Sequence, residues 1–97
     1  MTRMFTLSQQ AQRHIRGIRA WSIQHWGETK TRQYIGQLRL TMEGLSLNPH
    51  LGIDSSDDWP DTWRFPCNSH VIYYKPRPDG IIITAVLHKS QLPLRHL

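Results

Sequence analysis

Histidine is the residue type in this chain best suited to proton transfer. The 97 residues include six histidines, at positions 14, 25, 50, 70, 88 and 96. An imidazole has an unperturbed pKa of about 6.5, so it can give or take a proton near neutral pH. The six positions contain no His-x-x-x-His pair and no Cys/His set typical of zinc sites. We therefore expect no metal ion and no cofactor.

Two of these histidines stand at the ends of the strongest hairpin signal in the chain. The runs His70–Lys75 and Ile81–Leu87 are rich in β-branched and aromatic residues, and Pro76–Gly80 supplies a turn. Because both runs are almost wholly apolar, we expect this hairpin at the centre of a sheet that is covered on at least one face. His70 and His88 then either take part in chemistry or bond backbone groups at the strand ends.

Two amphipathic helices are predicted before the hairpin. Ser8 is a suitable N-cap for a helix over residues 9–26, and Gly27 ends that helix. A second helix follows at once and ends at Asn48-Pro49, so the two form an antiparallel hairpin. Apolar positions at a period of 3.6 predict their core faces: Ala11, Ile15, Ile18, Ser22 and Trp26, then Thr31, Tyr34, Ile35, Leu38, Met42 and Leu45.

The remaining segments complete an α+β fold. Met4–Leu7 is a candidate first strand, and Trp63–Phe65 begins a strand that ends in a turn at Pro66–Ser69. The predicted order is β-α-α-β-β-β, with the helical hairpin packed on an antiparallel sheet. A chain of 97 residues is long enough for one such domain, which we assign to residues 1–97.

The aromatic and cysteine residues give weaker indications. Trp21, Trp26 and Tyr34 have helical spacing, so we expect them in the core, whereas Trp59 and Trp63 border a loop and are the more plausible exposed rings. Cys67 is the single cysteine, so it has no internal disulfide partner, and no nucleophile-activating motif surrounds it. A lone cysteine and the absence of a secretory or membrane-spanning segment favour a cytoplasmic protein.

Charge is distributed unevenly along the chain. Residues 1–50 carry seven Lys/Arg against two acids, residues 51–61 carry four Asp and no base, and residues 62–97 carry five bases against Asp79. Two basic blocks separated by an acidic loop are compatible with a nucleic acid or an acidic protein as partner, and also with ordinary solvated charge.

Several apolar residues fall outside the predicted core faces. Leu40 and Leu47 lie seven residues apart on the far side of the second helix, with Gly36 in line, and Ile23 lies among the arginines of the first. Isolated exposed Leu and Ile are common on proteins. The alternative is a surface that accepts an amphipathic helix from a partner, which would contact Ile23, Gly36, Leu40 and Leu47.

The ordered set of motifs resembles the ParE branch of the RelE/ParE toxin superfamily, the toxins of type II toxin–antitoxin pairs. The resemblance covers nearly the whole chain. Its motifs are Phe5-x-Leu7-Ser8-x-x-Ala11, Ile15, Ile18, Trp26-Gly27, Tyr34-x-x-x-Leu38, Leu45, Pro49, Gly52, Arg64-Phe65, His70-Val71-Ile72-Tyr73-Tyr74, Ile81-x-Ile83-x-x-Val86-Leu87-His88 and Pro93-x-x-His96-Leu97. Leu92-Pro93 departs from the family pattern, which often has Met-Asp or Met-Pro there.

The superfamily implies two activities. RelE-like members cleave mRNA on the ribosome, which needs proton transfer and cations at the scissile phosphate. In this chain His88, His96 and Arg64 would be the catalytic candidates. Residues 62–97 offer a single carboxylate and few strand cations for such a site, so ribonuclease activity is the alternative reading.

ParE-like members instead bind DNA gyrase and block replication, and they are neutralised by a ParD-like antitoxin. This resemblance implies a binding protein rather than an enzyme. The residues expected to contact the target are Arg64, His88, Lys89, Arg95 and His96. A disordered antitoxin segment would fold on the helical hairpin as it binds. A non-toxic binding module of the same fold is a third possibility.

Overall fold

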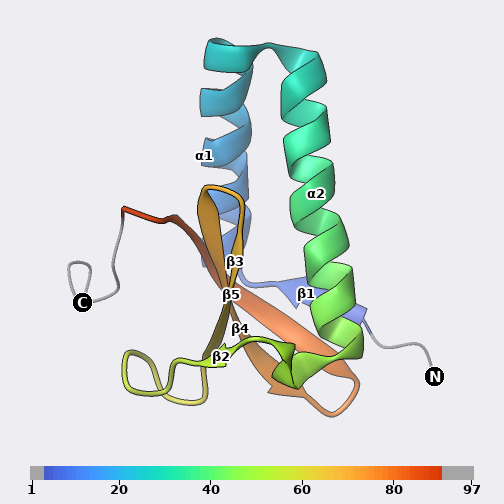
Figure 1. The fold of residues 1–97 in the computed structure, drawn as a ribbon, viewed down its shortest axis with the longest axis vertical. Coiled ribbons are helices and arrows are strands. Elements are labelled where there is room, and N and C mark those ends of the chain that lie inside the picture. The colour runs from blue at the N-terminus through green and yellow to red at the C-terminus, as the bar shows by residue number, and fades with distance from the viewer. Residues whose placement is uncertain (1–3, 91–97) are drawn as a thin grey trace.

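The computed structural model describes residues 4–90 of the chain (Figure 1). The predicted elements appear in the predicted order, and a two-residue strand, Ile53–Asp54, is added in the segment expected to be a loop. The elements are β1 (Met4–Leu7), α1 (Gln9–Trp26), α2 (Glu28–Leu47), a 3₁₀ turn (Pro49–Leu51), β2 (Ile53–Asp54), β3 (Trp63–Cys67), β4 (His70–Arg77) and β5 (Gly80–His88).

The two helices form the predicted antiparallel hairpin with a link of one residue. At the start of α1 the Ser8 hydroxyl accepts the backbone N–H of Ala11 at 3.1 Å. Gly27 joins the helices with φ of 87°, a left-handed conformation that a residue with a Cβ rarely adopts. Its N–H donates to the carbonyl of Ile23, and its own carbonyl accepts the N–H and the hydroxyl of Thr31. The Ser8 cap and the helix boundary at Gly27 predicted from the sequence are both confirmed.

The five strands form one sheet in the order β1-β5-β4-β3-β2. Strands β2 to β5 pair antiparallel, as expected, but β1 runs parallel to β5, with Phe5 opposite Ile81. The α+β fold class is therefore confirmed, and the sheet is mixed rather than wholly antiparallel. The direction of β1 was not predictable from local pattern, because β1 pairs with a strand more than 70 residues further along the chain.

Two of the three prolines expected in turns, Pro66 and Pro76, lie inside strands, whereas Pro78 lies in a turn as expected. Pro66 is in β3 opposite Val71, and Pro76 is in β4 opposite Ile81. Each proline lies where its strand is paired on one side only. β2 pairs with β3 no further along than Arg64, so Pro66 has only β4 beside it. β3 begins at Trp63, opposite Tyr74, so Pro76 has only β5 beside it. A missing N–H is tolerated where one edge of the strand carries no ladder. The turn after β3 is thus confined to Asn68 and Ser69.

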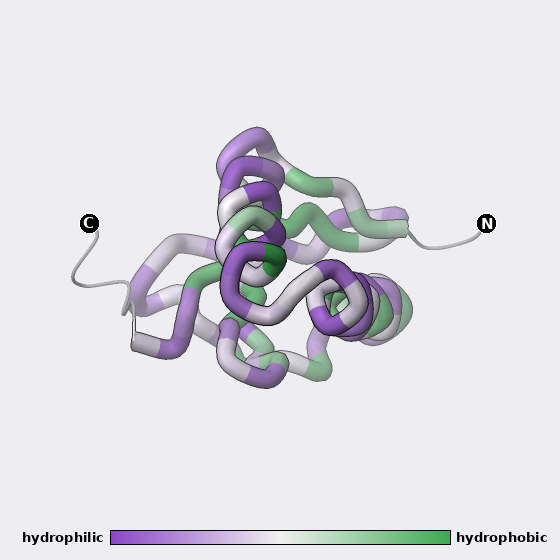
Figure 2. The backbone as a smooth tube through the Cα atoms, turned by 90° about the horizontal axis from the view of Figure 1, so that it is seen from above, coloured by the Kyte–Doolittle hydropathy of each residue, from purple (hydrophilic) through white to green (hydrophobic). Residues whose placement is uncertain are grey.

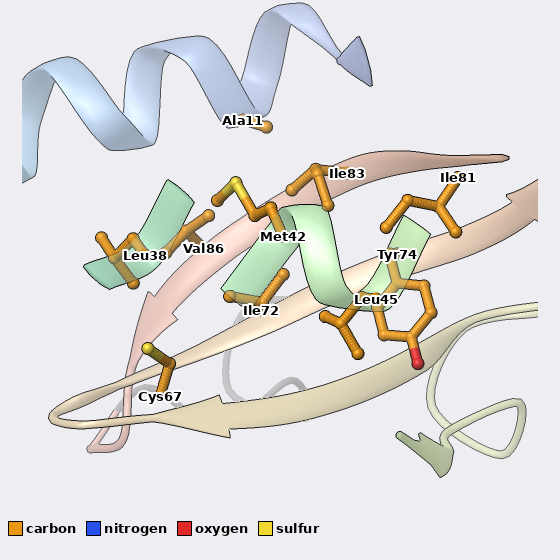
Figure 3. Packing of buried hydrophobic residues seen from close by; sticks show 10 residues of the cluster. All are labelled: Ala11, Leu38, Met42, Leu45, Cys67, Ile72, Tyr74, Ile81, Ile83 and Val86. Carbon is orange, nitrogen blue, oxygen red and sulfur yellow. The ribbon is translucent and has the colours of Figure 1, made fainter. Parts of the chain in front are cut away.

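The helical hairpin packs on one face of the sheet, and both helices mix hydrophilic and hydrophobic residues along their length (Figure 2). The core between helices and sheet is a cluster of fully or nearly fully buried side chains (Figure 3). It contains Ala11, Leu38, Met42, Leu45, Cys67, Ile72, Tyr74, Ile81, Ile83 and Val86.

The opposite face of the sheet has a second, smaller cluster. Tyr73, Ala85 and Leu87 are buried there, and the loop between β2 and β3 covers them with Trp59. The rings of Trp59 and Tyr73 meet edge to face, with centroids 4.9 Å apart. Both faces of the central strands are therefore covered, which explains why β4 and β5 are apolar along almost their whole length.

Candidate functional site

Arg64 lies on the face of the sheet that the acidic loop covers. It is opposite Tyr73 in the β3–β4 ladder, and its guanidinium donates to the Ser55 hydroxyl at 3.2 Å. That hydroxyl donates in turn to the Asp58 carboxylate at 3.1 Å. Burial raises the pKa of Tyr73, the Arg64 charge opposes that shift, and Asp58 adds to it. Arg64, the strand cation expected to bind a phosphate, therefore already forms a hydrogen bond with the acidic loop.

His70 and His88 lie together on the other face. They are directly opposite in the β4–β5 ladder, and their rings meet edge to face with centroids 5.4 Å apart. The Tyr34 hydroxyl of α2 contacts His70 Nδ1 at 2.5 Å and accepts the Ser69 N–H at 3.2 Å. Since the hydroxyl accepts from Ser69, its own proton is available for His70 Nδ1. Burial, followed by the nearby His88, lowers the pKa of His70, which favours a neutral ring carrying its proton on Nε2.

Arg64 and His88 therefore lie on opposite faces of the sheet. Side chains alternate between faces along a strand, and Arg64 shares its face with Tyr73, whereas His88 shares its face with His70 and Tyr34. Of the three residues proposed for nuclease chemistry, Arg64 and His88 consequently do not converge on one phosphate.

The other residues expected at the target surface lie at the end of β5 and beyond it. Lys89 is exposed, and its N–H donates to the carbonyl of Ser69 at 2.9 Å. The His88 ring nitrogen Nδ1 accepts the N–H of Ser90 at 3.1 Å. Arg95 and His96 lie outside the described residues.

The expected positions of the tryptophans are wrong. Trp21 and Trp26 are 51% and 41% exposed, whereas Trp59 and Trp63 are half-buried against the two clusters. The reason is the length of the helical hairpin. Its tip extends beyond the strands, so the inward face of α1 has no sheet to cover it there (Figure 1).

The apolar residues assigned to a partner surface are exposed. Leu40, Leu47 and Ile23 are 68%, 60% and 42% exposed, and a Cβ added at Gly36 would meet nothing within 4 Å. At 100° per residue, Gly36, Leu40 and Leu47 fall opposite the buried residues of α2, so they form one line along its outer face. Ile23 lies on the neighbouring helix.

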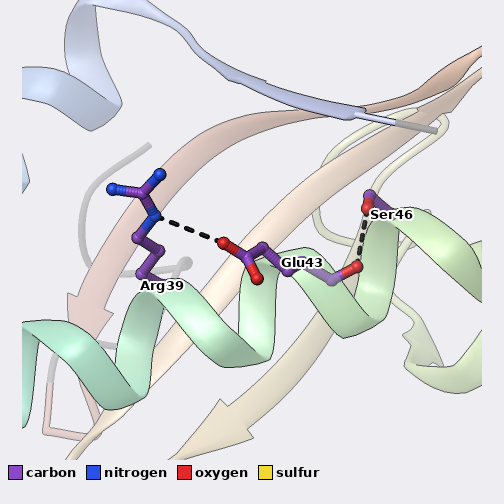
Figure 4. Close-up of polar contacts among 3 residues, drawn as sticks. All are labelled: Arg39, Glu43 and Ser46. Carbon is purple, nitrogen blue, oxygen red and sulfur yellow. Dashed lines mark hydrogen bonds and ion pairs between the residues drawn. The ribbon is translucent and has the colours of Figure 1, made fainter. Parts of the chain in front are cut away.

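A groove that sequence reasoning missed runs between the two helices and β1. It has a volume of about 590 Å³. Its apolar walls are formed by Phe5, Leu7, Ile15, Ile35, Leu38 and Met42. Arg39 also lines the groove. Its Nε is 3.3 Å from Glu43 Oε1, and the backbone carbonyl of Glu43 accepts a hydrogen bond from the Ser46 hydroxyl (Figure 4). The helical period marks Ile15 and Ile35 as inward-facing, but it does not reveal whether the space they face is filled.

Neither a group of metal ligands nor a membrane-spanning helix is found in the part of the chain that the structure describes. Across residues 4–90, no three His, Cys, Asp or Glu side chains are grouped closely enough to hold a metal ion. Neither described helix has the length and hydropathy that crossing a membrane requires.

Comparisons with known proteins agree with the fold and the motifs. The chain is 26% identical to "Toxin ParE" from Escherichia coli over 86 residues, which cover 88% of this chain and 84% of that protein. It is 29% identical to "Toxin ParE1" from Caulobacter vibrioides over 93 residues, which cover 96% of each. The solved structure "Chromosomal ParDE TA system from P. aeruginosa" contains a chain of the same fold, with a TM-score of 0.76 at 10% identity, covering 90% of this chain and 96% of that one.

The family model described as "ParE toxin of type II toxin-antitoxin system, parDE" matches residues 5–93. The match includes both helices and the paired strands of the sheet. The chain therefore belongs to the family of ParE toxins of type II toxin–antitoxin systems.

Proposed function

We propose that this toxin inhibits DNA gyrase and so blocks replication, and that a ParD-like antitoxin neutralises it. The proposal rests on membership of the ParE family and on one geometric observation. Arg64 and His88 face opposite sides of the sheet, so this cation and this histidine, two of the candidates for ribonuclease chemistry, cannot act together on one RNA phosphate. On this proposal the toxin acts by binding rather than by catalysis, and it acts in the bacterial cytoplasm, where gyrase is found.

The proposed target surface is the end of β5 and the segment that follows it. His88 and exposed Lys89 belong to this surface, together with Arg95 and His96 outside the described residues. Arg64 is a weaker candidate than the sequence suggests, because its guanidinium is engaged by Ser55 on the other face. A basic surface of this kind suits a gyrase–DNA complex, whose DNA carries a negative charge on every phosphate.

The proposed antitoxin surface is the outer side of the helical hairpin. Leu40 and Leu47 are two turns apart, the repeat at which an amphipathic helix presents its apolar residues, and the adjoining groove at Ile15 and Ile35 supplies further apolar area. A segment that folds as it binds can cover both, since such segments wrap large surfaces. Gly36 leaves open space in which a partner backbone can approach closely.

The test compares two purified targets. Toxin is added to gyrase with plasmid DNA, and in parallel to a translation system programmed with mRNA. The proposal predicts loss of supercoiling or accumulation of linear DNA, with intact mRNA, and reversal of both effects by antitoxin. Cleaved mRNA with normal gyrase activity would establish the ribonuclease alternative instead. Absence of any growth defect when the toxin is expressed without antitoxin would identify a non-toxic binding module.

A further inference from the structure

The tip of the molecule carries a continuous series of aromatic rings. Trp21 stacks on His25 with centroids 4.0 Å apart and meets Trp26 edge to face at 5.3 Å. Trp26 meets Tyr34 at 5.5 Å, Tyr34 meets His70 at 5.5 Å, and His70 meets His88 at 5.4 Å. These six rings, which we term the aromatic ladder, come from α1, α2, β4 and β5.

A pocket of about 340 Å³ opens beside the aromatic ladder. It is lined by Gly17, Ile18, Trp21, Trp26, Ser69, His70 and His88. Its volume is at the lower end of the range for small-ligand sites, which are mostly apolar with a few polar groups. Trp21 and Trp26 leave about half of their surface in water, so the ladder presents flat ring surface to a ligand.

Two lysines adjoin residues that line this pocket. Lys30 and Trp26 line an adjoining hollow of about 300 Å³, and Lys89 directly follows His88. Arg13 is one helical turn before Gly17, and α1 contains no acidic residue along its 18 positions. An aromatic surface bordered by Lys and Arg is the combination that binds single-stranded nucleic acid, in which bases stack on the rings and phosphates meet the cations.

The polar groups of the pocket suit the edge of a base. His70 Nδ1 contacts the Tyr34 hydroxyl; with that hydroxyl as the donor, the proton of the neutral ring is on Nε2, which can donate a hydrogen bond to a base. The Ser69 hydroxyl is a second group able to donate or accept.

We propose that this pocket binds an unpaired nucleobase of a single-stranded nucleic acid, with the base on Trp21 and Trp26 and the flanking phosphates at Lys30 and Lys89. The site is separate from Arg64, which lies on the opposite face, and from the outer face of α2. It gives the toxin a direct contact with nucleic acid that needs no other protein.

Gly17 offers a variant that blocks the pocket without removing any contact. A Cβ at this position meets nothing within 4 Å, and replacing a mid-helix Gly by Leu favours the helix. Gly17→Leu therefore fills the pocket while the fold is retained. Gly44→Leu is the matched control, because Gly44 also lies within a helix with open space around it and does not line the pocket.

The experiment measures binding of fluorescein-labelled oligothymidylate to the purified full chain by anisotropy, without gyrase. An abasic oligomer of equal length, which keeps the phosphates, and a duplex are compared with it. We expect the abasic oligomer and the duplex to bind at least about 10-fold more weakly. Gly17→Leu should weaken oligothymidylate binding by a similar factor, and Gly44→Leu should leave it unchanged.

Each opposite result overturns the proposal. Equal affinity for the abasic oligomer would show that phosphates alone are bound. Wild-type affinity in Gly17→Leu, or no binding by the wild-type chain, would exclude the pocket as a base site. Protection of Trp21 from acrylamide quenching by antitoxin alone, with no effect of oligothymidylate, would assign the pocket to a protein contact. Because gyrase is absent, these results are independent of the gyrase assay.

Discussion

The imidazole of His14 on α1 accepts the backbone N–H of Val86 on β5 at 3.1 Å. This bond continues a pattern on the β1 side of β5, because β1 ends at Leu7 and leaves the later residues of β5 without a strand on that side. Side chains at the start of α1 supply hydrogen bonds in place of the missing strand. The Ser8 hydroxyl and the Gln10 amide both donate to the carbonyl of Thr84. Side chains of one helix thus complete the hydrogen bonding of a central strand, and they fix the helical hairpin to the sheet.

Replacing His14 by Ala should destabilise the protein. The change leaves the Val86 N–H, now beneath α1, without its partner, and an unsatisfied buried donor costs about 1–3 kcal/mol. Urea denaturation followed by circular dichroism measures the effect. Gln24→Ala, an exposed substitution on the same helix, is the control and should change the free energy of unfolding by less than about 0.5 kcal/mol. Equal stability of the two variants would mean that the bond contributes nothing.

Stability should fall between neutral and mildly acidic pH. Burial, and then the Arg13 charge, lowers the pKa of His14, and burial, and then His88, lowers that of His70. The unfolded chain therefore binds protons at these sites more readily than the folded chain does. Their stabilising contribution is complete above the unfolded pKa of about 6.5 and is lost as the pH falls through the lowered folded values. Urea titrations from pH 7.5 to 5 test this, and the slope should be smaller in His14→Gln and in His70→Gln.

The outer face of α2 should control antitoxin binding. The double substitution Leu40→Asp and Leu47→Asp places two charges on the proposed apolar contact, and we expect antitoxin affinity to fall at least about 10-fold. Leu51→Asp with Ile53→Asp is a matched control, because these residues are 59% and 50% exposed outside the helices. Calorimetric titration with the antitoxin gives both affinities. Wild-type affinity in the α2 variant would remove this surface from the antitoxin contact.

The pairing of β1 with β5 should depend on Gly80. Its φ is +152°, and an added Cβ would collide with the backbone of Met4, so Gly80→Ala strains the turn and displaces β1. We expect a loss of about 2–4 kcal/mol and faster amide exchange in β1. Gly17→Ala is the opposite case, since it has open space in a helix and should stabilise by about 0.5–1 kcal/mol. A thermal scan that ranks the two variants the other way would contradict this account.

The end of β5 should matter more for the target than Arg64 does. His88→Ala with Lys89→Ala removes exposed groups of the proposed gyrase surface, and we expect about 10-fold more toxin to be needed for half inhibition of supercoiling. Arg64→Ala should have a smaller effect, because that side chain is held by Ser55 on the other face. Arg77→Ala, an exposed cation at the opposite end of the hairpin, is the control. Equal loss in all three variants would indicate a general charge effect rather than a defined surface.

The ends of the helices follow from residues that are neighbours in the chain. The Ser8 cap, the boundary at Gly27 and the end of α2 before Asn48-Pro49 all follow from local backbone chemistry, and all three agree with the structure. The fold class followed from the order of these elements and their apolar periods. The motifs that carry the family resemblance lie in the same elements, and the family match over residues 5–93 confirms it.

How these elements face one another depends on contacts between residues that are distant in the chain. The parallel pairing of β1 with β5 joins segments distant in the chain, and no local signal specifies its direction. Helical period showed that Trp26 and Ile35 point inward, but whether such a residue meets a sheet, a groove or solvent depends on where the sheet ends. Strand pairing likewise placed Arg64 and His88 on opposite faces. Local sequence sets a side chain's direction on its element, whereas long-range packing sets what lies in that direction.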